Sequence, residues 1–254
     1  MIDEAFMTLL LKRAFGLSGV ITEREVRIQE LRRNRITNGS PGRLIVKGGS
    51  TEFQHPTRES LQREDFLWKL SNTHMLDTYL HVMEEESHQQ MVEQIIQQFK
   101  EKILPNLSKF RKTLNHGDFS HTNILVQSQE LDISGILDFT DMNYGCSVCD
   151  VAISIMYLML ESSDPLSVGG HVLSGFESVT PLGPEERDAV FLLVLCRFSQ
   201  SLVLAKYNIL LYPENEEYLL TTARSGWKCL HQLWSLGKEA VEKIWYEAAK
   251  THCA

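Results

Sequence analysis

The sequence predicts an α+β protein that is mainly helical and carries one β-hairpin near its middle. Apolar residues recur at helical spacing through most of the second half of the chain. Two short β-rich runs, 123–127 and 132–137, flank a polar turn, which is the pattern of a hairpin. A chain of 254 residues can bury one sizeable core and a smaller element.

The first 52 residues are the least regular part of the sequence. Residues 3–15 carry apolar side chains at helical spacing and predict a short helix. Residues 22–28 fit either a capped helix start or a strand, and the pattern does not choose between them. Residues 34–49 have the composition of a loop. We therefore expect residues 1–52 to be a partly disordered N-terminal segment and residues 53–254 to form the main domain.

Helical periodicity dominates the main domain on both sides of the hairpin. Before the hairpin, residues 73–86 predict one helix, and Ser87 with Gln90 predicts the cap of a second that ends near Pro105. After the hairpin, residues 138–147 read as a loop. Five further helices are expected at 148–161, 168–178, 184–211, 214–224 and 226–250.

Composition and charge restrict the class of protein. Hydrophobic residues make up 43% and charged residues 23%, as in ordinary soluble proteins, and no continuous apolar run reaches the length of a membrane helix. The net charge is −8, divided into +3 over residues 1–52 and −11 over the remainder. So acidic a domain disfavours nucleic acid or acidic lipid as partners and suits a substrate that carries amino groups.

The cysteine count and the N-terminus indicate a cytoplasmic protein. Five cysteines in a chain of this length favour reduced thiols over a disulfide framework. Cys146 and Cys149 form an isolated C-x-x-C, which we interpret as packing thiols because no second pair accompanies it. The acidic start, Asp3 and Glu4, fits neither a secretory signal nor a transit peptide.

Three polar residues around the hairpin suit phosphoryl transfer, which depends mainly on positioning and charge neutralisation. Asp118 can accept the proton of a substrate hydroxyl that attacks the γ-phosphorus. Asn123 begins the hairpin and Asp138 leaves its second strand, so the hairpin brings their oxygens together. Such hard oxygen donors favour Mg²⁺. Each residue alone also fits a turn or a helix cap, but the combined pattern favours catalysis.

The run from His116 to Asp118, with Asn123 and Asp138, resembles the signature of the aminoglycoside phosphotransferase and choline kinase superfamily, relatives of the protein kinases. The resemblance begins near Gln54 and implies a kinase-like helical lobe. It also implies that Asp118 is the catalytic base and that Asn123 and Asp138 bind the metal. His116 would brace the catalytic loop. Asp150 would support that loop, although a helix N-cap for residues 151–161 explains it equally well.

Three further segments, 171–178, 212–215 and 225–228, resemble one branch of this superfamily. In that branch the γ-phosphate of GTP is transferred to the side-chain hydroxyl of 5-hydroxylysine. The resemblance therefore implies Mg²⁺, GTP or ATP as the phosphate donor, and a small amino acid as the acceptor.

Three charged residues are weaker candidates for binding that acceptor. Arg197 lies in an apolar helix and suits either a substrate carboxylate or a structural salt bridge. Asp141 and Glu177 suit the ammonium groups of a substrate or are ordinary surface carboxylates.

The N-terminal β-lobe of kinase-like proteins is not recognisable in the sequence. Such a lobe needs on the order of 90 residues, and only about 52 precede the main domain. Gly48, Gly49 and Ser50 form no complete phosphate-binding loop, so we interpret them as a linker. The sequence thus leaves two hypotheses, a working kinase or a catalytically impaired lobe that acts in binding. An exposed lobe interface would further predict self-association.

Overall fold

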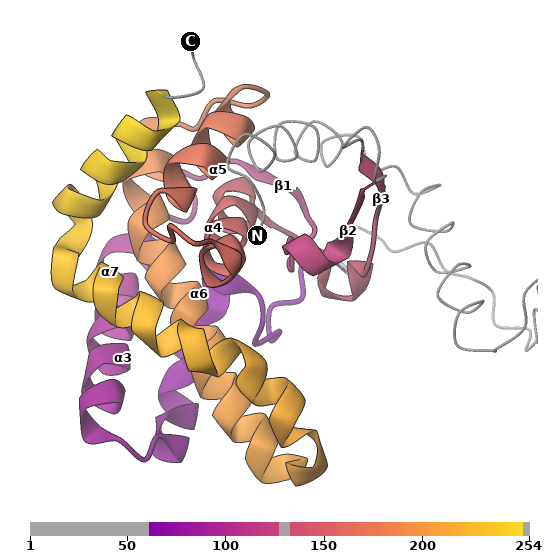
Figure 1. The fold of residues 1–254 in the computed structure, drawn as a ribbon, viewed down its shortest axis with the longest axis vertical. Coiled ribbons are helices and arrows are strands. Elements are labelled where there is room, and N and C mark those ends of the chain that lie inside the picture. Colours follow the sequence, from indigo (N-terminus) through magenta and orange to yellow (C-terminus); the bar gives the residue numbers. More distant parts are fainter. Residues whose placement is uncertain (1–60, 127–132, 251–254) are drawn as a thin grey trace, which may run out of the picture.

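The computed structural model describes residues 61–126 and 133–250, which fold as a helical body with short strands at one side (Figure 1). The first helical segments are the 3-10 helix η1 (Leu70–Val82) and helix α3 (Glu86–Gln98). One π-helical turn, η2 (Phe99–Ile103), and one 3-10 turn, η3 (Leu104–Asn106), continue α3. The predictions for residues 1–52 lie outside the described residues.

The first helical region differs from its prediction in type and in bounds. Residues 73–86 do not form one α-helix, since η1 is a 3-10 helix that ends at Val82. The side chain of Asn72 donates to the backbone oxygens of Glu64 (2.5 Å) and Phe66 (3.1 Å), which holds Asn72 outside helical geometry. Ser87 does not cap the next helix, because α3 begins one residue earlier, after Glu85.

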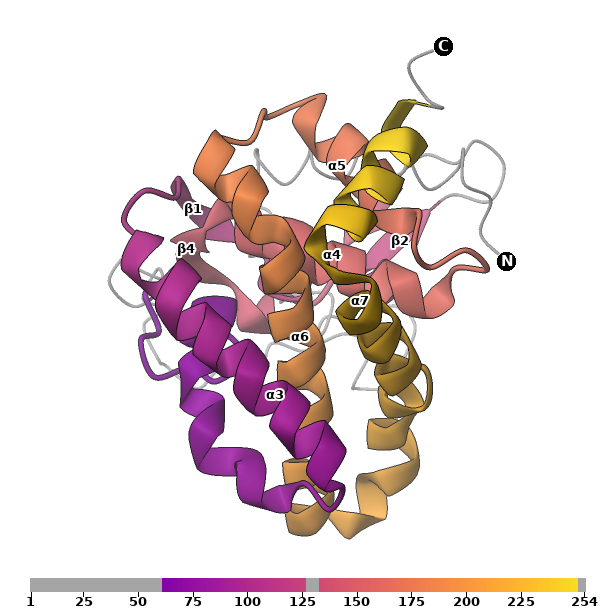
Figure 2. The same ribbon diagram turned by 90° about the vertical axis from the view of Figure 1, so that its left-hand side faces the viewer.

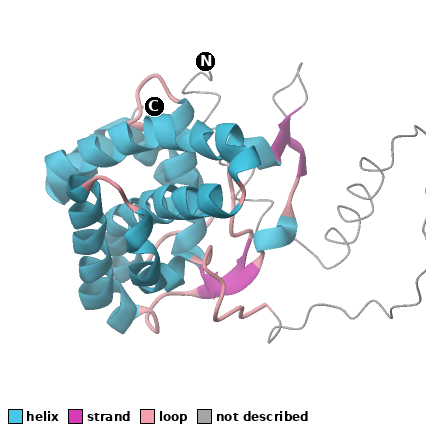
Figure 3. Cartoon of the chain, turned by 90° about the horizontal axis from the view of Figure 1, so that it is seen from below, coloured by secondary structure: helices cyan, strands magenta, loops and turns pink. Residues whose placement is uncertain are grey.

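The strands form two antiparallel pairs beside the helices (Figure 3). Strands β2 (Ile124–Val126) and β3 (Ile133–Ile136) make the hairpin that the sequence predicts. The second pair joins β1 (Lys112–Asn115) to β4 (Asn143–Cys146). The expected loop at 138–147 was therefore partly wrong, because its second half is a strand that pairs with residues about thirty positions earlier.

The second half of the chain is almost entirely helical. Its elements are α4 (Ser147–Glu161), α5 (Val168–Glu177), α6 (Pro184–Leu211), η6 (Pro213–Asn215) and α7 (Glu216–Lys250). The first three lie within one residue of their predicted bounds. The predicted separation of 214–224 from 226–250 was wrong. One helix, α7, runs through Gly226, and its break falls at Gly237, where φ is 75°.

Helix α6 occupies the centre of the body and packs against η1, α4 and α7 (Figure 2). Its start combines Pro184 in the first turn with Glu186, whose carboxylate accepts the backbone N–H of Gly183 at 2.9 Å. Within the described segments it is the one helix long and apolar enough to span a membrane. Its most apolar 18-residue stretch has a mean hydropathy of 1.7, but 94% of that stretch is buried inside the protein. A buried core helix has this composition.

Candidate active site

The residues from His116 to Asp118 form a tight loop between β1 and the short 3-10 turn η4 (His121–Asn123). Gly117 has a φ of 83°, a conformation that costs other residues energy. A β-carbon at this position would also lie only 2.2 Å from the backbone oxygen of Asp141. Glycine is therefore required here for two reasons, and the loop lies directly against the chain after the hairpin.

The Asp118 carboxylate is held from two sides. Its Oδ1 accepts a hydrogen bond from the guanidinium of Arg197 at 3.0 Å, and its Oδ2 accepts one from the Asn123 amide at 3.2 Å. The same amide donates to the backbone oxygen of Asp118 at 2.8 Å. The side chain of Asp118 is 29% exposed, so a substrate can still reach the carboxylate.

Arg197 projects from the middle of α6 and is 1% exposed. Besides Asp118, its guanidinium donates to the Tyr157 hydroxyl at 3.0 Å and to the backbone oxygen of Trp68 at 3.2 Å. The guanidinium also lies 4.9 Å from the centre of the Trp68 ring. Arg197 is thus an internal partner of Asp118 that connects the loop from His116 to Asp118 to the central helix.

His116 joins the loop from His116 to Asp118 to the end of the hairpin. Its Nε2 donates to the backbone oxygen of Leu137 at 2.8 Å, because a carbonyl can only accept. The neutral ring then accepts the backbone N–H of Asp118 through Nδ1 at 3.3 Å. The ring lies against Phe119 and Phe139, so its position is fixed by packing as well as by hydrogen bonds.

Asp150 holds the same loop from the other side. Its two carboxylate oxygens accept the backbone N–H groups of His116 at 2.7 Å and Gly117 at 3.0 Å. Burial raises the pKa of Asp150, while the hydrogen bonds from these two backbone amides partly oppose this shift. The helix-cap interpretation of Asp150 is wrong, since the residue that precedes α4 as its cap is Cys146.

The hairpin brings Asn123 and Asp138 to the same end. There the backbone N–H of Leu137 donates a hydrogen bond to the backbone oxygen of Asn123 at 2.7 Å. Because the Asn123 amide nitrogen faces two oxygens of Asp118, its Oδ1 is directed elsewhere and is suited to a cation. Asp138 adopts a left-handed conformation (φ 56°), and its Oδ1 accepts from Thr140. The donor set fits Mg²⁺. No cluster of three His, Cys, Asp or Glu residues suited to a metal occurs among the residues described.

A cavity of about 490 Å³ opens beside Asp118. Asp141 and Arg197 also line it, as do three residues that sequence reasoning missed, namely Trp68, Tyr157 and Glu161. Burial, and then the charge of Asp118, raise the pKa of Asp141. A signal for two of the missed residues existed, because Tyr157 and Glu161 are four residues apart on α4 and therefore share one face of that helix.

Glu177 lies apart from this cavity. Its carboxylate forms an ion pair with Arg187 at 2.8 Å, between the end of α5 and the start of α6. Glu177 is absent from the lining of the cavity at Asp118. The structure thus brings together Asp118, Asp141 and Arg197 but leaves Glu177 outside the group.

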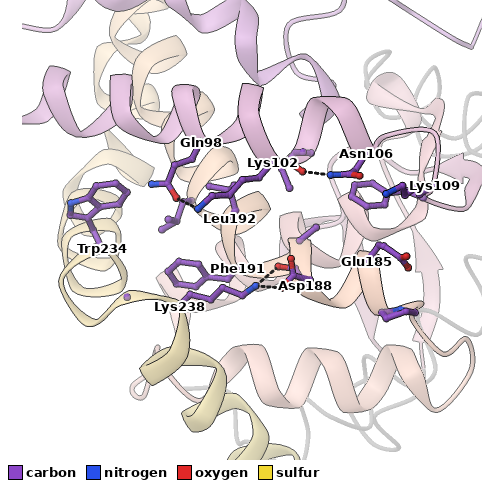
Figure 4. A pocket seen from close by; sticks show the side chains of 16 residues that line it. Gln98, Lys102, Asn106, Lys109, Glu185, Asp188, Phe191, Leu192, Trp234 and Lys238 are labelled. Carbon is purple, nitrogen blue, oxygen red and sulfur yellow. Dashed lines mark hydrogen bonds and ion pairs between the residues drawn. The ribbon is translucent and has the colours of Figure 1, made fainter.

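A larger cavity of about 810 Å³ lies between α3, α6 and α7 (Figure 4). Phe191, Leu192 and Trp234 contribute apolar surface to it, and the ammonium of Lys238 pairs with Asp188 at its edge. None of the site residues predicted from the sequence lines this cavity. The smaller cavity is therefore the candidate active site, because it alone of the two contains Asp118.

Comparison with known proteins agrees with this geometry. Residues 46–177, more than half of the chain, match a model of the phosphotransferase enzyme family. A hydroxylysine kinase of Bos taurus is 52% identical over 220 residues, which cover 83% of this chain and 58% of the relative. Hydroxylysine kinases of Xenopus laevis (51% over 218 residues; 83% and 58% covered) and Danio rerio (47% over 202 residues; 78% and 57%) are similar.

The chain spans less than two thirds of the length of these relatives. The matched family region includes the loop from His116 to Asp118, the hairpin, α4 and α5. The resemblance noted in the sequence is thereby confirmed, and the chain belongs to the phosphotransferase enzyme family.

Proposed function

We propose that this protein is a small-molecule kinase that transfers the γ-phosphate of GTP to the side-chain hydroxyl of 5-hydroxylysine. The observation that carries the proposal is the position of Asp118, which lines a 490 Å³ cavity while Asn123 and Arg197 donate hydrogen bonds to its carboxylate. A cavity of this size is within the range of small-molecule sites. The similarity to hydroxylysine kinases supports the choice of acceptor.

Asp118 acts as the general base. An acceptor hydroxyl in the cavity donates its proton to the carboxylate as its oxygen attacks the γ-phosphorus. The hydrogen bonds from Arg197 and Asn123 fix the orientation of that carboxylate, so little reorganisation is needed during the reaction. His116 and Asp150 position the loop without contacting the substrate.

Asn123 and Asp138 would hold Mg²⁺ at the open end of the hairpin, where β2 begins and β3 ends. When bound, the ion neutralises charge on the phosphates of the donor. GTP is the donor proposed here, and ATP is the alternative that a kinase of this family could use.

The cavity suits an acceptor with ammonium groups. Asp141 and Glu161 contribute carboxylates to its lining. A dibasic amino acid such as 5-hydroxylysine would place an ammonium group near one of these carboxylates while its hydroxyl faces Asp118.

The test is phosphate transfer by the purified full chain with GTP, Mg²⁺ and 5-hydroxylysine, with lysine as the acceptor control. Asp118→Asn should lower kcat by about 10²–10⁴-fold, because the amide cannot accept the proton. Asp164 is exposed and lies outside the lining of the cavity, so Asp164→Asn should leave kcat unchanged. Turnover that survives Asp118→Asn would contradict the proposal. Absence of turnover in the unmodified protein would also contradict it, whereas tight magnesium-dependent binding of GTP in calorimetry would count against the alternative of a catalytically impaired lobe.

A further inference from the structure

The C-x-x-C of this chain lies in a setting that its sequence does not reveal. Cys146 is the last residue of β4 and the capping residue of α4, and Cys149 lies in the first turn of that helix. The partial positive charge of a helix start favours a thiolate. All four cysteines of the described segments are free thiols, so this pair is reduced in the structure.

Two lysines increase the positive charge around Cys146. Lys112 lies opposite Cys146 in the β1–β4 pair, and its ammonium donates to the Cys146 sulfur at 2.8 Å. Lys69 also lies near Cys146. Its Cε is 3.7 Å from the position that a β-carbon would take on Gly145, the residue before Cys146. Burial and the charge of Lys112 lower the pKa of Lys69, which shows that the two ammonium groups share one region.

Cys149 is placed to complete a dithiol. Its thiol donates a hydrogen bond to the Cys146 sulfur, which together with Lys112 lowers the pKa of Cys146 to about 6. The same hydrogen bond and burial raise the pKa of Cys149. Residues three apart at a helix start have Cα atoms about 5 Å apart, a spacing that a disulfide spans.

We propose that Cys146 and Cys149 form a site of reversible oxidation by hydrogen peroxide, with Cys146 as the attacking thiolate and Cys149 as the resolving thiol. The sulfur of Cys146 attacks one peroxide oxygen. An S–O bond forms, the O–O bond breaks, and the hydroxide that leaves takes a proton from solvent to become water. The sulfur of Cys149 then attacks the sulfenic acid. The S–S bond forms, the S–O bond breaks, and the thiol proton leaves with the hydroxyl as a second water. Two thiols are oxidised and one peroxide is reduced to two waters.

Both cysteines are buried, so the site favours a small oxidant. Cys146 is 1% exposed and Cys149 5% exposed, so a bulky disulfide cannot reach either sulfur. Lys112 is exposed, and its flexible side chain separates the Cys146 sulfur from solvent. The disulfide would form next to Asp150, which holds the backbone of His116 and Gly117.

The test follows thiol chemistry in the reduced full chain and does not depend on kinase activity. Stoichiometric hydrogen peroxide at pH 7 should remove two mass units and yield one peptide linked through Cys146 and Cys149, which thiol reductant restores. In Cys149→Ser, dimedone should instead label Cys146. Lys112→Met, which removes the charge but keeps the length, should slow oxidation by about tenfold, since thiolate nucleophiles depend on nearby cations.

Cys229→Ser is the matched control, because burial raises the pKa of the Cys229 thiol and the charge of Lys228 only partly opposes this shift. It should leave both the linkage and its rate unchanged. Oxidation that reaches Cys229 as fast as Cys146, no linkage under peroxide, or equal rates with Lys112→Met would each overturn the proposal.

Discussion

At the scale of single residues, the partners of Asp118 differ in how far away they lie in the sequence. Asn123 lies five residues along the chain, and its contact with Asp118 follows from the local loop. Arg197 lies 79 residues away, and no local pattern indicates its contact. The sequence therefore allowed two interpretations of Arg197, and the structure shows that its guanidinium forms an ion pair inside the protein.

The raised pKa of Asp141 leads us to expect that the free energy of unfolding depends on pH. Burial and the neighbouring charge of Asp118 raise the pKa of Asp141, so the folded state keeps this proton to a higher pH than the unfolded chain. Between the unfolded pKa of about 4 and the folded pKa, the folded state binds more protons, and stability falls as the pH rises. Asp141→Asn should remove that fall and increase the free energy of unfolding at pH 7.

Urea unfolding of both proteins between pH 4 and pH 8 measures the effect. The difference between them should shrink toward pH 4, because the carboxyl of Asp141 becomes increasingly protonated in both states. An equally steep decline in the variant would show that Asp141 is not its source.

At the scale of elements, close helix packing depends on small residues that periodicity alone does not locate. Predictions for α4, α5 and α6 agree with the structure because each has long apolar periodicity and a clear end signal. Strand β4 was missed because a four-residue strand is defined by its partner β1. The break of α7 was predicted between residues 224 and 226, but the helix continues through Gly226, which packs against Leu202, and breaks at Gly237.

Gly170 of α5 should be intolerant of a methyl group. A β-carbon there would lie 2.2 Å from the backbone oxygen of Trp245, and a backbone atom of α7 cannot move without moving that helix. We expect Gly170→Ala to lower the free energy of unfolding by about 1–3 kcal/mol, the cost of overpacking, despite the better helix propensity of alanine.

Gly226→Ala is the matched helical control. Its β-carbon would meet only a terminal carbon of Leu202 at 3.1 Å, which a small rotation of that side chain relieves. Urea unfolding should show little loss, or a gain, for this variant. Equal losses for the two variants would refute the packing argument.

At the scale of the whole molecule, α6 connects two hydrophobic clusters. Leu193 belongs to the larger cluster, which draws mainly on α4, α5, α6 and α7 and also on η1 and α3, and Leu204 belongs to a smaller cluster formed with η1 and α3. Because one continuous helix contributes to both clusters, we expect the described body to unfold in one cooperative step.

Leu193→Ala and Leu204→Ala should each lower the free energy of unfolding by about 2–5 kcal/mol, because each creates a cavity in a buried site. In each variant, as in the unmodified protein, the unfolding transition seen by tryptophan fluorescence should coincide with the transition seen by circular dichroism. Two separated transitions in either variant would show that the clusters unfold independently.

The sequence by itself determined the family, the mainly helical class and the group of Asp118, Asn123 and Asp138 as candidates for phosphoryl transfer. These features are legible because they depend on periodicity and on spacings within a local loop and hairpin. Only the tertiary structure decided which distant residues meet that group. Arg197, Tyr157 and Trp68 reach Asp118 or its cavity because α6, α4 and the segment before η1 pack together. Packing depends on three-dimensional contacts between distant segments, and a single sequence does not display those contacts.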